Sequence, residues 1–244
     1  MKISVVTVAY NSEKGIGKTI ESVLRQSWGD VEYLIIDGKS SDRTVEIAES
    51  YRNALEEKGI VYQIVSEPDN GIYDAMNKGI HMASGDVIGL LNSEDTYEPC
   101  ALQTVAETFA RTDCELMFAN IRIHKPDGSS FVKRARQRRF QTSRDWNHPT
   151  TFVRADVYKA NPFRNLGIHD DYGFYLQMRR QNRRIVTVDE VLADFRMGGA
   201  SNRKNLKAAG KRIMDRYKYC YRINGYSRWY LAECVFIEAV KMLV

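Results

Sequence analysis

Four short apolar runs recur in the first half of the chain, and segments with helical periodicity separate them. The runs are KISVVTV (2–8), VEYLIID (31–37), IVYQIVS (60–66) and DVIGLL (86–91). Continuous rather than alternating apolar residues are typical of strands that are buried on both faces. Strands that alternate with helices form a parallel sheet with helices on both sides. The sequence therefore predicts an α/β fold around a mostly parallel sheet.

Polar residues follow each of the four predicted strands. Ligands of parallel sheets bind in the crevice at the carboxyl ends of the strands. We therefore expect the four polar clusters to face one crevice. They are Thr7, Tyr10 and Asn11, then Asp37, then residues 67–71, and last residues 92–95.

Two neighbouring segments carry the clearest chemical signal. SEPDNGIYDAMNKGI (66–80) joins a strand end to a glycine turn and an amphipathic helix, and the acidic run LLNSED (90–95) ends the next strand. Carboxylates and phosphate oxygens are the ligands that Mg²⁺ and Mn²⁺ prefer. Asp95, with Glu94 beside it, is the candidate metal ligand. The alternative is a solvated acidic turn.

Two further strand-end residues have both a functional and a structural interpretation. Gly71, before the helix that begins at residue 72, could bring backbone N–H groups to a diphosphate, or it could simply permit a turn. Asp37 could accept hydrogen bonds from a base or ribose, or it could be structural. Asp42 is expected to cap the following helix.

The second half of the chain is less regular. Residues 114–124 and 129–134 predict a hairpin joined by the turn PDG, and residues 148–154 a short strand. A helix is expected to begin near residue 171, and residues 184–197 are expected to be extended. At that helix start, Asp170 and Asp171 could form a simple cap, or they could supply a general base. His148 could contact a substrate or could be a structural histidine.

The net charge of +5 on 244 residues is modest but unevenly distributed. Residues 133–139 (KRARQRR) hold five basic side chains, and residues 203–228 hold nine against the single acid Asp215. Such runs are either solvated surface or binding sites for an anionic partner. They contain no recognisable nucleic-acid-binding motif.

The last residues, 226–244, place Val235 and Phe236 on an apolar helix face that charged residues interrupt. This pattern is a poor membrane span. A helix lying on an anionic membrane surface and a helix packed on the domain or on a second subunit remain equal alternatives. No signal peptide is visible at the N-terminus.

Six segments, taken in order, resemble the family 2 glycosyltransferases over residues 2–202: SVVTVAYNS, IIDGKSSDRT, SEPDNGIYDAMNKGI, LLNSED, HPTTFVR and HDDYGF. With FRMGGAS (195–201), they are most similar to bacterial enzymes of exopolysaccharide and O-antigen synthesis, including the colanic-acid type. The resemblance implies a GT-A fold, a Rossmann-like sheet flanked by helices. It also implies a catalytic domain (1–202) with a nucleotide-sugar half (1–97) and an acceptor half (98–202), followed by a helical extension (203–244).

The resemblance implies roles for individual residues. Asp95 would hold Mn²⁺ or Mg²⁺, and Asp171 would be the catalytic base. The residues near the donor sugar or the acceptor would be Glu94, His148, Thr150 and Asp170. The residues that bind the nucleotide would be Thr7, Ala9, Tyr10, Asp37, Asn70 and Gly71.

Two motifs depart from the family pattern. The acidic motif reads NSED where NSDD or DSDD is usual, and the acidic pair begins with Asp170 where a glutamate or a small residue is usual. The QxxRW motif of processive members is absent, which predicts transfer of one sugar per encounter.

The activity implied is that of a metal-dependent inverting hexosyl- or deoxyhexosyltransferase. It would take a nucleotide-diphosphate sugar as donor and a polyprenyl-diphosphate-linked glycan as acceptor. The enzyme would act at the cytoplasmic face of the bacterial inner membrane, and homo-oligomers are possible. One alternative is a sugar nucleotidyltransferase, although AYNSEKGIG (9–17) lacks the Gly-rich basic loop of such enzymes. The other is a nucleotide-sugar-binding protein without transfer activity.

Overall fold

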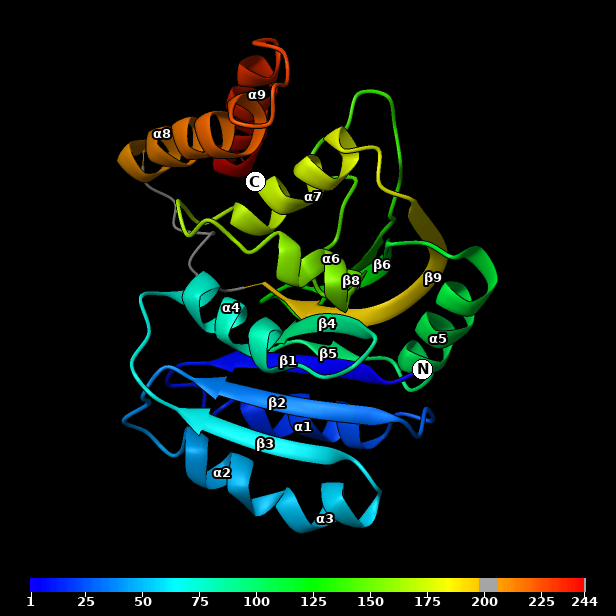
Figure 1. Ribbon diagram of the computed structural model, residues 1–244. Helices are drawn as coiled ribbons and strands as arrows, with labels where there is room; N and C mark the ends of the chain where they lie inside the picture. Colours follow the sequence, from blue (N-terminus) through cyan, green and yellow to red (C-terminus); the bar gives the residue numbers. More distant parts are fainter. Residues whose placement is uncertain (198–205, 244) are drawn as a thin grey trace.

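The computed structural model describes residues 1–197 and 206–243, and Figure 1 shows one curved sheet with helices on both sides. In the described residues the sheet has nine strands in the order β3-β2-β1-β4-β8-β6-β9-β5, and β7 pairs with β6 off this path. The predicted α/β class is confirmed.

The first half builds the parallel part of the sheet. Its strands are β1 (Ile3–Ala9), β2 (Val31–Asp37), β3 (Val61–Ser66) and β4 (Val87–Asn92). β1 pairs in parallel with β2 on one side and with β4 on the other, and β3 extends the sheet beyond β2. In this register Ala9 pairs with Asp37, which pairs with Ser66. The four predicted strands therefore end side by side, as expected.

Helices cover both faces because successive strand residues point to opposite sides. Ile3 and Val5 of β1 belong to a buried cluster with α1 (Ile16–Leu24) and α5 (Ala101–Thr112), while Val6 and Val8 belong to a second cluster with α4 (Ile72–Met82) and α7 (Asp170–Arg180). The first cluster also takes in α2 (Thr44–Ser50) and α3 (Arg52–Glu57), and the second takes in α6 (Ala155–Ala160).

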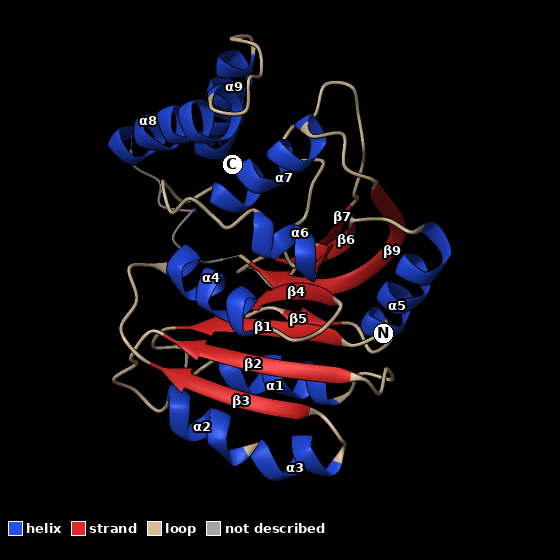
Figure 2. Ribbon diagram, viewed as in Figure 1, coloured by secondary structure: helices blue, strands red, loops and turns tan. Residues whose placement is uncertain are grey.

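The second half extends the sheet with mixed pairing. β6 (Leu116–His124) forms the predicted hairpin with β7 (Ser130–Lys133). It also pairs antiparallel with β8 (Phe152–Arg154), which joins β4, and parallel with β9 (Ile185–Arg196). The short β5 (Thr96–Tyr97) pairs with the edge of β9. Figure 2 shows α6 and α7 above this sheet.

The chain ends in α8 (Leu206–Asp215), the π-helical segment η2 (Arg216–Arg222) and α9 (Tyr230–Leu243). Cys220 of η2 and Cys234 of α9 are buried in the same cluster as α7. Glu238 makes buried ion pairs with Arg212 (2.7 Å) and Arg216 (3.3 Å), which tie the three helical segments together. Among the described residues, no helix is long and apolar enough to cross a membrane.

One side of α9 packs on the domain and the other faces solvent. Tyr230, Cys234 and Ile237 are buried. Val235 and Phe236, from the apolar face predicted by the sequence, are exposed, Phe236 by 62%. Trp229, just before the helix, is 79% exposed. The extension therefore covers the domain and still presents large apolar side chains to solvent.

Candidate functional site

A cavity of about 920 Å³ lies between the parallel strand ends and the second half of the chain. Its walls come from the loop after β4, the start of α4, the loop before β8 and the start of α7. Asp95 and Asp171 both line it, although they come from different halves. Three other predicted site residues line it as well, namely Gly71, Glu94 and His148.

Asp95 lies in a tight turn directly after β4 and is only 3% exposed. Its amide donates to the carbonyl of Asn92 (3.0 Å), and its carbonyl accepts the hydroxyl of Thr19 (2.8 Å). Burial raises the pKa of its carboxyl to about 7, although hydrogen bonds from Asn92 and from the backbone of Arg196 act in the opposite direction. Within the described residues, no cationic side chain makes an ion pair with this carboxylate.

The groups around Asp95 fit a hard divalent cation. Oδ1 of Asn92 is buried and has no hydrogen-bond partner in the part of the chain that is described. The side-chain nitrogen of the same residue, Nδ2, lies 3.5 Å from Oδ2 of Asp95. Carboxylate and amide oxygens suit Mg²⁺ and Mn²⁺. The described residues contain no group of three or more His, Cys, Asp or Glu side chains placed to hold a metal ion. A cation here would therefore complete its shell with oxygens of a ligand or water.

The Asp171 carboxylate is fixed by three neighbours from separate elements. Tyr73 donates its hydroxyl to Oδ1 (3.0 Å), and the amide of Tyr172 donates to the same oxygen (2.8 Å). Nδ1 of His148 lies 3.4 Å from Oδ2. These contacts hold the carboxylate in one orientation at the cavity wall, which is what a general base requires.

His148 is shielded from solvent beside this carboxylate. Burial lowers its pKa, and the negative charge of Asp171 only partly offsets that effect. Its second ring nitrogen, Nε2, is buried without a hydrogen-bond partner among the described residues. The side chain of Trp146 packs edge-on against the imidazole ring at 5.9 Å between centroids. A neutral imidazole beside a carboxylate can hold that carboxylate in place and leave it able to accept a proton.

The loops after β1 and β2 are bound to each other at the same edge of the sheet. The amide of Asn11 donates to the Ser40 hydroxyl (2.8 Å), and the amide of Ser41 donates to the Asn11 side chain (2.9 Å). A Cβ at Gly38 would lie 2.5 Å from Oδ2 of Asp69, so the loop after β3 approaches closely here and a larger residue would displace the Asp69 side chain. Tyr10, at the end of β1, is 66% exposed.

Two of the predicted nucleotide-binding residues are fully buried. The hydroxyl of Thr7 pairs with that of Tyr33 (3.1 Å). The Asp37 carboxylate accepts the amide of Ser40 (2.9 Å) and the hydroxyl of Ser66 (2.6 Å). Both side chains thus have partners inside the protein, and their contacts with a nucleotide stay a prediction.

The turn before α4 differs from the expected anion cradle. The amide of Asn70 donates to Asp74 (2.9 Å), and the amide of Gly71 donates to Asp69 (2.8 Å). Gly71 has φ of 107°, a conformation that favours glycine. These two N–H groups are therefore already satisfied by carboxylates. Ala9 is buried and, like Tyr10 and Asn70, does not line the cavity.

Thr150 and Asp170 hold the walls of the site rather than facing its cavity. The hydroxyl of Thr150 donates to the carbonyl of Ala119 (2.8 Å), and Thr150 is fully buried. The Asp170 carboxylate accepts the amide of Leu166 (2.7 Å), which fixes the loop before α7. Both side chains thus have partners inside the protein, and their contacts with the donor sugar or the acceptor stay a prediction. Asp42 was expected to be the N-cap of the following helix, but Arg43 occupies that position without a side-chain cap hydrogen bond, and Asp42, one residue earlier, accepts the amide of Thr44 (3.0 Å).

Tyr73 and Arg216 are among the cavity residues that were not identified from the sequence. Tyr73 lies in the conspicuous segment 66–80, and its place at the start of α4 was the signal that could have found it. Arg216 comes from η2 in the C-terminal extension and is 2% exposed. Nothing in the basic run 203–228 distinguishes this arginine from its neighbours.

The comparisons with known proteins identify the family of this chain. Residues 4–183 match the family model described as glycosyl transferase family 2. TuaG of Bacillus subtilis, named as a putative teichuronic acid biosynthesis glycosyltransferase, is 25% identical over 228 residues, which are 91% of this chain and 89% of TuaG. The uncharacterized glycosyltransferase Rv1514c of Mycobacterium tuberculosis is 41% identical over 96 residues, which are 39% of this chain. The chain spans about a third (34%) of that relative's length.

Two solved structures have a similar fold. S. aureus TarS in complex with UDP gives a TM-score of 0.64 at 19% identity, covering 98% of this chain and 71% of that chain. The mannosyltransferase PcManGT of Pyrobaculum calidifontis, in complex with GDP-Man and Mn²⁺, gives a TM-score of 0.67 at 12% identity, covering 99% and 69%. At these identities the likeness shows the fold alone.

Proposed function

Because this chain belongs to glycosyl transferase family 2 and has a GT-A fold, we propose that it is a metal-dependent, inverting enzyme of bacterial surface polysaccharide biosynthesis. The observation that carries the proposal is that Asp95 and Asp171 line one cavity. A carboxylate that binds a cation suits the leaving diphosphate, and an oriented base suits the attacking hydroxyl. One cavity that holds both can therefore carry out a single displacement. The relative named for teichuronic acid biosynthesis, matched over most of both chains, supports this polysaccharide class.

In the proposed reaction, Asp171 accepts the proton of an acceptor hydroxyl while that oxygen attacks the anomeric carbon of the donor sugar. A bond forms from the acceptor oxygen to the anomeric carbon, and the bond from that carbon to the diphosphate oxygen breaks. The nucleoside diphosphate leaves from the opposite face, so the configuration inverts. Tyr73 and His148 keep the carboxylate aimed at the acceptor through the contacts described above.

The divalent cation would be held by Asp95 and by Oδ1 of Asn92. When bound, such an ion stabilises negative charge that develops on a diphosphate leaving group. Glu94 is exposed at the cavity wall and would meet the donor sugar or ribose. The nucleoside would lie on the loops after β1 and β2, which are hydrogen-bonded to each other, and against the exposed ring of Tyr10.

We propose a lipid-linked glycan as the acceptor and a peripheral position on an anionic membrane. The support is the surface of the C-terminal extension. Trp229 and Phe236 are exposed there, together with exposed basic residues of the same segment, Lys211, Lys218, Arg222 and Arg228. An anionic lipid surface binds segments that expose both apolar and cationic side chains.

A thermal-shift screen of UDP-, GDP- and dTDP-sugars with Mn²⁺ tests the donor assignment, because a ligand of the folded state raises its stability. We expect one nucleotide class to raise Tm, and its sugar to be transferred to lipid-linked glycans extracted from membranes. Failure of every nucleotide sugar to bind would overturn the proposal. Binding without release of nucleoside diphosphate would favour the binding-protein alternative, and formation of nucleoside triphosphate from pyrophosphate would favour a nucleotidyltransferase.

A further inference from the structure

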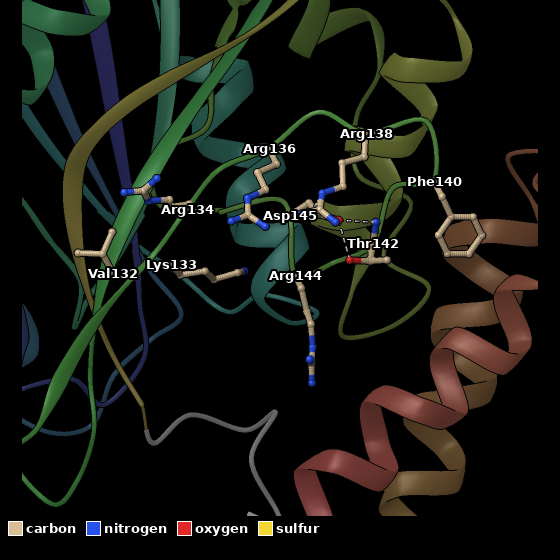
Figure 3. Close-up of a pocket in the computed structure, with 9 residues that line it drawn as sticks. All are labelled: Val132, Lys133, Arg134, Arg136, Arg138, Phe140, Thr142, Arg144 and Asp145. Carbon is tan, nitrogen blue, oxygen red and sulfur yellow. Dashed lines mark hydrogen bonds and ion pairs between the residues drawn. The ribbon is translucent and has the colours of Figure 1, made fainter.

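A second hollow, of about 680 Å³, lies next to the cavity and is strongly cationic (Figure 3). Lys133 and Arg144 line both spaces, so the two hollows meet. Five basic side chains line the second hollow, and one carboxylate accompanies them: Lys133, Arg134, Arg136, Arg138 and Arg144, with Asp145. The basic run 133–139 of the sequence therefore forms a concave surface beside the site.

Two of these cations hold the loop in shape. Lys133 donates to the carbonyls of Ser143 (3.2 Å) and Trp146 (2.7 Å), which closes the loop on itself. Arg138 pairs with Asp145 at 3.3 Å. Arg179 of α7 donates to the carbonyl of Arg138 (2.8 Å), which ties the loop to that helix. These contacts hold the loop together without Arg136 or Arg144.

The other arginines are not used by that frame. Arg136 and Arg144 contribute exposed side chains, and in the part of the chain that is described neither guanidinium lies within 4.0 Å of a carboxylate. Figure 3 shows Arg144 extending away from the loop. Like charges held together in one hollow repel each other, and a bound anion removes that repulsion. The planar guanidinium matches a phosphate group in a bidentate manner.

Arg216 adds a buried guanidinium to the cavity wall. Its Nη2 contacts Nε2 of His169 (3.1 Å) and Glu238 (3.3 Å). Its Nε and Nη1 are buried and have no hydrogen-bond partner among the described residues. Buried donors of this kind are rarely left unsatisfied, so this guanidinium at the cavity wall has hydrogen-bonding capacity that the described residues do not use.

Arg216 and Arg144 both act electrostatically on one side chain of α9. Burial raises the pKa of Glu233, and the charges of Arg216 and Arg144 both act against that rise, so both guanidinium groups lie within electrostatic reach of this carboxylate. Arg216 comes from η2 and Arg144 from the loop before β8, and both line the cavity. An anion bound there would lie between the basic loop and the C-terminal extension.

We propose that Arg136, Arg144 and Arg216 form an anion site, distinct from the metal site at Asp95, that binds a phosphate or diphosphate group carried by the acceptor. The inference rests on the proposed function, since it assigns the anion to the molecule whose hydroxyl reaches Asp171. With its phosphate held there, the acceptor presents its sugar to the shared cavity and approaches from the side of α9.

Calorimetric titration of inorganic pyrophosphate into the full chain tests the site. EDTA is present throughout, and Asp95→Asn is included, so that metal-dependent binding at Asp95 does not contribute. We expect the wild-type chain and Asp95→Asn to bind pyrophosphate equally. Arg136→Gln/Arg144→Gln should weaken binding by about tenfold or more, since each lost contact is a charge-assisted hydrogen bond. Arg216→Gln should do the same.

The matched control is Arg139→Gln, because Arg139 is an exposed arginine of the same loop that does not line the hollow. If the control weakens pyrophosphate binding equally, the anion is attracted only by the general positive charge of the loop, and the proposed site is overturned. Absence of wild-type binding at millimolar pyrophosphate would also overturn it. If Arg216→Gln does not fold, the exposed Arg136 and Arg144 decide the outcome.

Two further measurements distinguish the acceptor-phosphate site from a membrane-binding surface and from the proposed function as a whole. If Arg136→Gln/Arg144→Gln loses binding to phosphatidylglycerol vesicles but keeps wild-type pyrophosphate affinity, the ligand is a membrane surface and the acceptor assignment is overturned. The thermal shift with nucleotide sugars should be unchanged in this variant. A chain that binds no nucleotide sugar but retains arginine-dependent pyrophosphate binding would overturn the proposed function and support the anion site.

Discussion

The hydroxyl of Tyr73 donates a 3.0 Å hydrogen bond to Asp171 across a sequence separation of 98 residues. Tyr73 lies in the first turn of α4 and Asp171 in the first turn of α7, so this bond joins the two halves of the chain at the cavity. The candidate base is thus held by the half that carries the candidate metal ligand. Catalytic groups need such fixed geometry from their neighbours.

Asp171→Asn should retain the nucleotide-sugar thermal shift and lose transfer by about 10²–10⁴-fold, because the amide cannot accept the proton of the acceptor hydroxyl. Initial rates with saturating donor measure the loss. Asp156→Asn, which removes an exposed carboxylate of α6, is the matched control and should keep wild-type rates. A variant at Asp171 with wild-type turnover would exclude this residue as the base.

Tyr73→Phe should lower kcat and leave KM for the donor nearly unchanged. The hydroxyl holds the Asp171 carboxylate in one orientation, so its loss should let the base turn away from the acceptor and slow proton transfer. The cavity wall keeps its aromatic ring, so the free energy of unfolding should change by only about 1 kcal/mol. A wild-type kcat in this variant would mean that the hydroxyl does not position the base.

The parallel half of this fold was predictable because its information is local. Continuous apolar runs such as 31–37 identify buried strands, and the alternation with helices fixes their parallel order. The break between α2 and α3 at Tyr51 and the helix α5 were missed. Neither carries a strong stop or start signal, and tertiary packing decides both.

The candidate site was predictable only as a set of strand ends. Asp95 and Gly71 follow apolar strands, and the parallel register brings such positions to one edge. The sequence could not reveal that the Thr7 hydroxyl pairs with Tyr33 inside the core, since that depends on which face of β1 it occupies. The contact between Arg216 and His169, from separate elements, is likewise set by packing alone.

Asp95→Asn should abolish the stabilisation that Mn²⁺ and donor give together, because the cation loses its carboxylate ligand. The same variant without metal should be at least as stable as wild type, since burying a neutral amide costs less than burying an uncompensated carboxylate. Thermal melts with and without EDTA measure both effects. Donor stabilisation that persists in excess EDTA would remove the metal requirement.

His148→Gln should make stability less dependent on pH on the acid side of neutrality. Burial holds the pKa of His148 below its ordinary value of 6.5, so below that pH the unfolded chain binds a proton that the folded chain does not. Wild-type stability should therefore fall as pH drops through about 6.5, by about 1.4 kcal/mol per unit of pKa depression, and the variant should lack this loss. His81→Gln, at an exposed position on α4, is the control, and Tm measured from about pH 7 to about pH 5 decides the outcome.

Trp229→Ser/Phe236→Ser should reduce co-sedimentation with phosphatidylglycerol vesicles without unfolding the extension. Both side chains are mostly exposed, whereas Tyr230, Cys234 and Ile237 hold α9 on the domain. Deleting the whole segment would confuse the two effects, because it removes these core contacts as well. Val61→Ser, which removes an apolar side chain 56% exposed on edge strand β3, is the matched control.

A membrane contact and a subunit contact at α9 make opposite predictions for this double variant. Each exposed aromatic that inserts among lipids contributes its buried apolar area, so losing both should weaken vesicle binding about tenfold or more. If vesicle binding is unchanged while a concentration-dependent dimer disappears in analytical ultracentrifugation, α9 is a subunit interface instead. The acceptor would then have to reach the cavity without help from this surface, since α9 would be covered by a second copy of the chain.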